Sequence, residues 1–314
     1  MNFTKLRLLA AGAGIFAITI LIYYYYGVTT LQQNQQTDNA GIDKFKTKDI
    51  YPTKKGGREW FMNMDDPTND KMFSITSDIP ITRNSNDGSW FIDKPEVRMN
   101  VNTPKGEPAW KNVEITGYVK PTSIINSVGN GGGDGGGSGE GQGEEESTGS
   151  DGKSIPPGIS WHARGGVHSS SAPCEGTALN GGLDIIDGNA SWKKEIWHTG
   201  GYTDARGTTK ATDDPLLGKW IGWKVIMYNI DNDKAVKMES YIDDNNKNDW
   251  KKVTELTDDG GWFANTSDDV FYSAGCGKPK DYIITNGGSI VTFRSDNVSY
   301  YFKNFSVREI QPPS

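Results

Sequence analysis

Short segments that alternate apolar and polar residues recur along this chain, and they constrain its fold more than any other feature. Residues 96–102 (EVRMNVN) place Val97, Met99 and Val101 on one face and polar side chains on the other. Residues 113–120 (VEITGYVK) repeat this period of two. Because successive side chains of a β-strand point to opposite faces, the alternation is typical of strands that bury one face against a core. Both segments are therefore predicted to be strands.

Similar segments, separated by turn-forming residues, continue to the C-terminus. The pair 220–229 and 236–243 flanks an Asp/Asn turn and predicts a β-hairpin. The other predicted strands are 159–164, 192–198, 283–285, 290–294 and 300–310. The 10 Trp, 13 Tyr and 39 Gly of this 314-residue chain suit strands and turns, and none of these segments has helical periodicity. The pattern predicts an all-β fold in which two antiparallel sheets pack face to face.

An uncharged apolar run lies near the N-terminus, at residues 8–28 (LLAAGAGIFAITILIYYYYGV). A run of about 20 apolar residues is long enough to span a bilayer as a transmembrane helix. Lys5 and Arg7 precede the run and the next basic residue is Lys44, so the positive-inside rule keeps the N-terminus cytoplasmic. A cleaved signal peptide is the alternative, although no small-x-small cleavage site follows. We expect a single-pass cell-membrane protein whose residues 1–28 contact the lipid bilayer and whose C-terminal domain is extracellular.

Composition divides the rest of the chain. Residues 29–48 are polar and predict a stalk, and residues 49–310 are expected to form a single β-sandwich domain. Residues 127–157, rich in Gly, Ser and Glu, cannot bury a core and predict a disordered insertion within that domain. A linker between two domains is the alternative. The insertion is favoured because the segment before it has too few strands for a sheet of its own.

Several features agree with export and argue against nucleic acid as a partner. In an oxidising compartment, Cys174 and Cys276 are expected to form a disulfide, because they are far apart in the sequence and form no CxxC pair of the kind found in zinc sites. A net charge of −7 and a pI near 5.1 do not suit binding to a polyanion. The N-x-S/T pattern predicts glycosylation, at Asn189, Asn265, Asn297 and Asn304.

Three pieces of the sequence together resemble the concanavalin A-like lectin/glucanase superfamily. They are the hairpin GKWIGWKVIMYN…AVKMESYIDD, the following WKKVTE, and the closing strand YYFKNFSVREI. The resemblance, which extends to uncharacterised secreted proteins of this superfamily, implies a jelly-roll β-sandwich over residues 51–310. Its families include lectins, carbohydrate-binding modules, glycoside hydrolases and polysaccharide lyases. The glucanase motif ExDxxE is absent, and this chain offers only EVRMNV and EIWH as partial counterparts of the alginate-lyase motifs, with no third motif. The resemblance therefore carries over no catalytic residues.

A polar and aromatic set lies opposite the apolar faces of the predicted strands. On a jelly roll such a set can line a groove, where aromatic rings stack on sugars and charged groups bond hydroxyls or carboxylates. A solvated convex face is the alternative, since the pattern does not assign a strand to a sheet. The candidate ligand-binding residues are Arg98, Tyr118, His162, Trp220, Lys224, Tyr228, Glu239 and Tyr241.

A second set surrounds the histidines, which all fall between residues 162 and 198. A polysaccharide lyase needs a cation for the uronate carboxylate, a base for the C5 proton and an acid for the leaving oxygen. Arg164, His198 and Tyr202 are the candidates for these roles in that order. A glycoside hydrolase needs two carboxylates, and Glu195 with Glu239 is the candidate pair. Structural hydrogen bonding by the histidines, or metal binding by them, are the alternatives.

The sequence carries no motif that requires a cofactor. An acidic loop suggests a structural calcium ion as a candidate. Asp244, Asn246, Asn248 and Glu255 have calcium-loop offsets, but the turn glycine is replaced by Asp249, which favours a solvated hairpin tip. The sequence as a whole predicts a membrane-anchored protein that binds a polysaccharide or glycan. A polysaccharide lyase or glycoside hydrolase using the same groove is the first alternative, and a structural cell-envelope protein is the second.

Overall fold

The computed structural model describes residues 41–76, 79–125 and 155–313. The chain divides into two compact units, Met1–Pro52 and Thr53–Ser314, and the second contains the strands. The predicted transmembrane helix, most of the predicted stalk and nearly all of the Gly-rich insertion lie outside the described residues. Within the described residues, every helix is too short or too polar to cross a membrane.

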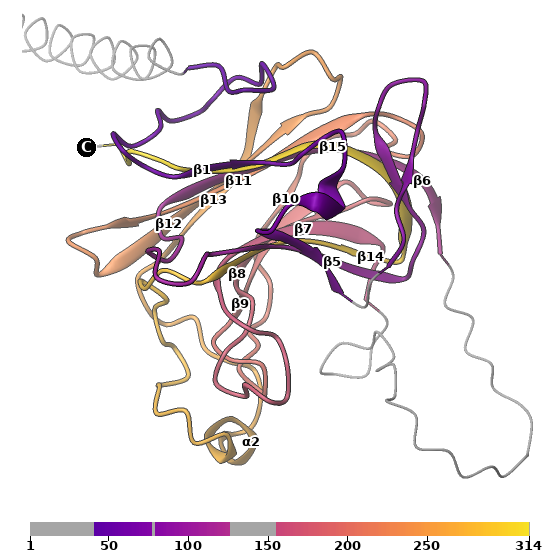
Figure 1. Ribbon diagram of the computed structural model, residues 1–314. Helices are drawn as coiled ribbons and strands as arrows, with labels where there is room; N and C mark the ends of the chain where they lie inside the picture. The colour runs from indigo at the N-terminus through magenta and orange to yellow at the C-terminus, as the bar shows by residue number, and fades with distance from the viewer. Residues whose placement is uncertain (1–40, 77–78, 126–154, 314) are drawn as a thin grey trace, which may run out of the picture. The chain divides into compact units, whose positions relative to one another are not determined.

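One sheet has eight antiparallel strands and is called the eight-stranded sheet below. Seven of them follow the order β13-β12-β11-β6-β15-β4-β3, and β1 pairs with β15 (Figure 1). Their bounds are β1 Glu59–Phe61, β3 Thr82–Arg83, β4 Trp90–Ile92, β6 Val113–Ile124, β11 Ile221–Ile230, β12 Ala235–Asp243, β13 Lys251–Asp258 and β15 Val298–Glu309. The predicted hairpin is confirmed, since β11 and β12 pair along their whole length. Its turn, at Asp231, Asn232 and Asp233, has positive φ, which Asp and Asn tolerate better than most residues.

The other sheet has seven antiparallel strands in the order β10-β9-β8-β7-β14-β5-β2. Their bounds are β2 Phe73–Ile75, β5 Glu96–Asn102, β7 Gly158–Gly165, β8 Ala178–Asp184, β9 Asn189–Glu195, β10 Arg206–Lys210 and β14 Ile290–Asp296. Among the described residues, two short helices accompany the sheets, η1 (Pro67–Asn69) and α2 (Asp268–Ser273). The last two strands of the chain, β14 and β15, each lie inside a sheet between earlier strands, so folding of either sheet requires the C-terminus.

The core lies between the two sheets and is rich in tryptophan. Trp161 of the seven-stranded sheet donates a hydrogen bond from its indole nitrogen to the Trp223 carbonyl, at 3.0 Å, and Trp223 donates back across the core to the Gly181 carbonyl, at 3.2 Å. A Cβ atom at Gly181 would lie only 2.6 Å from Val225 Cγ2 of the opposite sheet. These contacts confirm the predicted all-β sandwich of two antiparallel sheets that pack face to face.

A buried ion pair also connects the two sheets. Lys194 of β9 donates from Nζ to Asp258 of β13 at 2.9 Å and to the Tyr282 carbonyl at 3.0 Å, and both charged side chains are 0% exposed. Burial lowers the pKa of Lys194 and raises the pKa of Asp258, and each partner's charge opposes the shift of the other. The residue after Lys194 is Glu195, whose side chain points to the opposite side of the sheet. Strand β9 therefore contributes one side chain to the core and the next to the site described below.

Candidate functional site

The side of the seven-stranded sheet that faces away from the core is polar, and it is called the polar face below. The cross-strand register places Arg98 of β5 opposite Arg294 of β14, and Thr292 of β14 opposite His162 of β7. His162 in turn lies opposite Asn180 of β8. The polar face comprises Glu96, Arg98, Ser160, His162, Asn180, Thr292, Arg294 and Asp296.

The two arginines are the strongest charges on the polar face, and carboxylates compensate both. Arg98 Nε lies 2.8 Å from Glu96 Oε1, and Arg294 lies 2.7 Å from Asp296 and 3.4 Å from Glu96. Burial, and then the neighbouring Arg294, lower the pKa of Arg98. Burial opposes ionisation of Glu96, but the charges of Arg294 and Arg98 outweigh it and lower the pKa of that carboxyl. The face therefore holds two like charges side by side, balanced by acids at one end.

His162 lies between these arginines and the next strand. Its ring nitrogen Nε2 is 2.6 Å from Ser160 Oγ. Burial, followed by the charges of Arg294 and Arg98, lowers the pKa of His162 well below its usual value, so the imidazole is neutral at neutral pH. It can consequently both donate and accept a hydrogen bond.

Several buried polar atoms on this side of the sheet have no hydrogen-bond partner among the described residues. They are Arg98 Nη1, His162 Nδ1, Asn180 Oδ1 and Glu195 Oε1. Buried polar groups are normally hydrogen-bonded, and leaving one unsatisfied is costly. The guanidinium donor of Arg98 on β5, the neutral imidazole of His162 on β7 and the amide oxygen of Asn180 on β8 lie on the same face of the sheet, and water or the hydroxyl groups of a ligand can satisfy groups of these kinds.

A compact group of side chains lies where the polar face meets two loops, and it is called the histidine cluster below. It comprises His168, Glu195, His198 and Tyr202. His168 lies in the loop between β7 and β8, Glu195 ends β9, and the other two lie in the loop between β9 and β10. A backbone bridge sets Tyr202 opposite Glu195. His168 Nε2 lies 3.1 Å from His198 Nδ1, 3.3 Å from the Tyr202 hydroxyl and 3.3 Å from Glu195 Oε1.

Glu195 is the buried member of the histidine cluster, and hydrogen bonds hold its carboxylate in place. Its Oε2 accepts hydrogen bonds from the backbone nitrogen and the hydroxyl of Thr177, the former at 2.8 Å. Burial alone would raise the pKa of Glu195, but His168 and Thr177 hold it at about 2, so the carboxylate is ionised at neutral pH. Burial and the charge of Glu195 raise the pKa of Tyr202, which keeps its phenol protonated.

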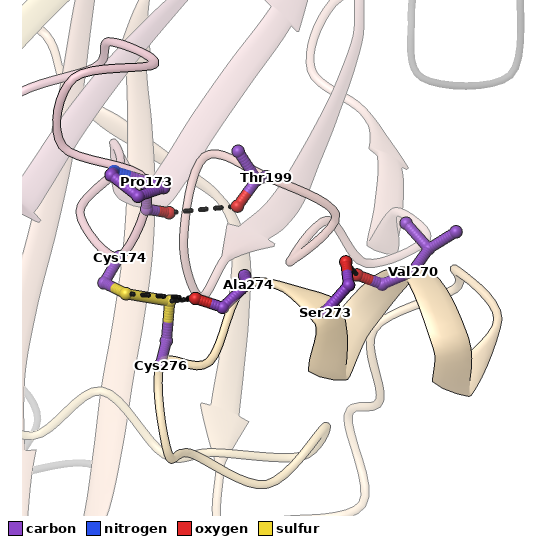
Figure 2. The surroundings of a disulfide bond; sticks show 7 residues. All are labelled: Pro173, Cys174, Thr199, Val270, Ser273, Ala274 and Cys276. Carbon is purple, nitrogen blue, oxygen red and sulfur yellow. Dashed lines mark hydrogen bonds between the residues drawn. A yellow bond between two sulfur atoms is a disulfide. The ribbon is translucent and has the colours of Figure 1, made fainter.

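A disulfide fixes the loop between β7 and β8, which carries His168 of the histidine cluster. Cys174, in the loop after β7, is bonded to Cys276, which follows α2, as predicted from the sequence (Figure 2). Beside it, the Thr199 hydroxyl donates to the Pro173 carbonyl at 3.2 Å. The Ala274 carbonyl lies 3.4 Å from the Cys276 sulfur, which is a close contact because a disulfide sulfur has no hydrogen to donate.

The structure divides the predicted ligand-binding residues between the two sheets. Arg98 and His162 lie on the polar face. The others on strands lie on the outer face of the eight-stranded sheet, where they are buried: Tyr118, Lys224, Tyr228, Glu239 and Tyr241. There Lys224 is bonded to Glu114 at 2.7 Å. Trp220 directly precedes β11, and Lys303 lies 4.1 Å from the centre of its ring. The eight residues thus belong to two separate surfaces.

The predicted lyase residues are only partly brought together. The Tyr202 hydroxyl lies 3.4 Å from His198 Nδ1. Arg164 does not join them: its Nη1 donates to Asn229 Oδ1 at 2.5 Å and to the Ile284 carbonyl at 2.7 Å. Its backbone has a φ of 66°, beside a register shift between β7 and β14, which interrupts the alternation of the strand there.

Other sequence-based candidates are also separated by the fold. Glu195 and Glu239 lie on different sheets, each on the side away from the core, so they do not flank one glycosidic bond. Arg294, Asn180 and Thr177 were missed as site residues. The first two alternate with core residues as Arg98 does, so the pattern could have indicated them once the strand pairing was known.

The acidic loop and the sequons differ in their surroundings. Asp243 accepts hydrogen bonds from Lys247 N at 3.1 Å and Asn248 N at 2.7 Å, which is the arrangement of a hairpin tip. Of the sequons, Asn265 is exposed, whereas Asn297 is buried and donates from its side-chain nitrogen to the Ile155 carbonyl at 2.8 Å. The other two, Asn189 and Asn304, are half-buried.

Comparison with known proteins gives similarity of structure but not of sequence. The chain matches no protein-family model and no curated protein sequence. Among solved structures it is similar to peanut lectin with a bound peptide (9% identity, 82% of this chain and 99% of that chain, TM-score 0.38). It is also similar to winged bean acidic lectin complexed with methyl-α-D-galactose (9%, 82% and 100%, 0.40) and to a protein of unknown function with a galectin-like fold from Bacillus subtilis (10%, 82% and 100%, 0.40). The two antiparallel sheets of this chain confirm the predicted β-sandwich.

Proposed function

We propose that this protein binds carbohydrate through the polar face of its seven-stranded sheet, and that the ligand is an acidic glycan. The observation that carries the proposal is the set of buried, unpartnered polar atoms on one face of the sheet: His162 and Asn180 on the adjacent strands β7 and β8, and Arg98 on β5, which β14 separates from β7. Sugar hydroxyls both donate and accept, so they can satisfy a guanidinium donor, a neutral imidazole and an amide oxygen together.

The unpartnered guanidinium nitrogen of Arg98 favours an acidic sugar over a neutral one, because a charged donor bonds most strongly to an anionic acceptor. Arg98 and Arg294 lie side by side, and a uronate carboxylate or a sulfate bound near Arg98 Nη1 would relieve their mutual repulsion. Aromatic stacking contributes little here, because the aromatic residues of β5, β7, β8, β9 and β14 all face the core: Trp161, Trp192 and Phe293. Binding that depends on charge and hydrogen bonds should weaken as salt is raised.

The test is a binding titration of the full chain, kept in detergent, with uronate and neutral oligosaccharides of equal length. Arg98→Gln removes the charged donor at a side chain that is 11% exposed. We expect the affinity for the uronate oligosaccharide to fall about 10-fold or more, the usual value of a hydrogen bond to a charged group. The control is Arg83→Gln, which removes an exposed arginine of β3 in the other sheet. Equal affinities in both variants, or no preference for the acidic sugar, would contradict the proposal.

A polysaccharide lyase is the second candidate, and the convergence of His198 and Tyr202 beside the polar face favours it. In such a reaction His198 would take the proton next to the uronate carboxylate, the carbon–oxygen bond to the neighbouring sugar would break as a double bond forms, and Tyr202 would protonate the leaving oxygen. The ultraviolet absorbance of unsaturated uronate ends in the same titration separates turnover from binding. Absorbance that stays flat while binding saturates would leave only the binding function.

We also propose that residues 1–28 anchor the protein in the cell membrane with the sandwich outside. The disulfide between Cys174 and Cys276 supports an oxidising compartment. Protease added to intact cells should remove the sandwich. Full protection in intact cells, with digestion after lysis, would contradict the extracellular placement.

A further inference from the structure

We propose that His168, Glu195, His198 and Tyr202 form a tetrahedral binding site for Zn²⁺. This inference goes beyond carbohydrate binding and does not depend on it, since it concerns the loops at the end of the polar face. It competes with the lyase, because a metal ion would occupy the His198 nitrogen and the Tyr202 oxygen that the lyase needs.

The distances within the histidine cluster are those of a tetrahedron of metal ligands. Zinc bonds nitrogen and oxygen at about 2.0–2.2 Å, which places the ligand atoms of a tetrahedral site about 3.3–3.6 Å from one another. His168 Nε2 lies 3.1 Å from His198 Nδ1, 3.3 Å from the Tyr202 hydroxyl and 3.3 Å from Glu195 Oε1. His198 Nδ1 lies 3.4 Å from the Tyr202 hydroxyl and 3.9 Å from Glu195 Oε1. Four of these five distances lie within about 0.2 Å of that range, and the longest exceeds it by about 0.3 Å.

Hydrogen bonds alone do not explain this convergence. An imidazole Nε2 carries either one hydrogen or one lone pair, so it can make one good hydrogen bond in the plane of its ring. His168 Nε2 nevertheless has three polar atoms within 3.3 Å. Glu195 Oε1, also at this centre, is buried, and its 3.3 Å contact with His168 Nε2 lacks the geometry of a hydrogen bond. A single cation at the centre would satisfy all four atoms together.

The types of ligand atom indicate zinc rather than calcium or magnesium. Two imidazoles and one carboxylate are ligands that zinc prefers, whereas calcium and magnesium prefer sites made of oxygen. Glu195 has the support that metal-binding carboxylates usually have, because its other oxygen accepts two hydrogen bonds from Thr177. Tyr202 completes the fourth position as a phenol oxygen.

The site is both reachable and held in place. The side chains of His168 and His198 are each 20% exposed, so an ion can enter from solvent. The His198 backbone nitrogen donates to the Glu175 carbonyl at 2.5 Å, and Cys174, next to Glu175, is fixed by the disulfide. A site that is already assembled loses little entropy when the metal binds.

The experiment is a competition titration of the full chain in detergent, first stripped of metal with a chelator and then given Zn²⁺ in the presence of a chromogenic chelator. We expect one zinc ion per chain. His168→Ala and His198→Ala should each weaken zinc binding by more than about 100-fold, the upper loss seen when only an outer partner is removed. Both side chains are partly exposed, so these variants should fold, and thermal unfolding without metal checks this. His162→Gln is the matched control, because it removes the third histidine from the same sheet and should leave zinc affinity unchanged.

Cobalt supplies a second measurement that a structural role for these residues would not affect. Co²⁺ in a tetrahedral site absorbs strongly in the visible range, and in an octahedral site it absorbs weakly. The wild-type chain should give the strong spectrum, and Tyr202→Phe should shift it while keeping metal bound. A wild type that binds zinc no more tightly than the His168→Ala variant, or a weak octahedral cobalt spectrum, would overturn the inference. No glycan is present in either measurement, so this proposal and the glycan proposal fail independently.

Discussion

The disulfide between Cys174 and Cys276 is the perturbation whose cost can be worked most directly from the structure. The two cysteines are 102 positions apart. Closing a loop of that length removes entropy from the unfolded chain that corresponds to about 4.7 kcal/mol at 25 °C, and removal of native disulfides costs about 2–5 kcal/mol. We therefore expect the double variant Cys174→Ser/Cys276→Ser to lose about 2–5 kcal/mol of unfolding free energy.

Local packing limits how far the native fold changes in this variant. Phe271 of α2 packs against Trp197 with ring centres 4.2 Å apart, and both are buried, so α2 should stay docked without the disulfide. The native structure should then stay the same, and the variant should differ from the wild type in its free energy of unfolding. Urea unfolding of the full chain in detergent, followed by tryptophan fluorescence, measures it. A loss below about 1 kcal/mol, which is ordinary for a surface substitution, would refute the entropic reasoning.

Three further predictions concern the sandwich itself and are checked by urea or acid unfolding. Gly181→Ala should cost about 1–3 kcal/mol through overpacking, because the new Cβ would meet Val225 at 2.6 Å; an unchanged urea midpoint would contradict this. Lys194→Met should cost about 3–5 kcal/mol by leaving Asp258 buried and unpaired, and a second change, Asp258→Leu, should recover much of the loss; if it recovers none, the ion pair is not the cause. Glu96 has a lowered pKa in the folded chain, so its ionisation stabilises the fold above its unfolded pKa and the benefit is lost as the pH falls. Glu96→Gln should therefore reduce the loss of stability on acidification, and an identical acid profile would argue against the arginine contacts.

The strands that alternate clearly were predictable from sequence, and those that break the alternation were not. Residues 96–102 coincide with β5. In contrast, β8 (ALNGGLD) was missed because paired glycines are typical of turns. Gly181 is required in that strand for a tertiary reason, the approach of Val225 and Trp192 from the core, which no local pattern reveals. The helix α2 was also missed, although Ser267 caps it and two acidic residues follow, because a single turn has too few residues to show a period.

The candidate site was predictable only in part, for a similar physical reason. Alternation shows which residues point away from the core, as with Arg98 and His162, but it does not show which sheet a strand joins. Tyr118 and Lys224 follow the same rule and belong to the other sheet. His198 and Tyr202 were identified from their chemistry, yet their meeting with His168 depends on two loops and a disulfide.

The most direct test of glycan binding at the polar face uses the three histidines as reporters in one NMR titration. Each can be assigned by substitution, since the chain has only His162, His168 and His198. The central claim is that the polar face binds an acidic glycan. Titration of the full chain with a uronate oligosaccharide should therefore shift the side-chain resonances of His162 in a saturable manner. Saturable binding that leaves the resonances of His162 unmoved would place the ligand elsewhere and contradict that claim.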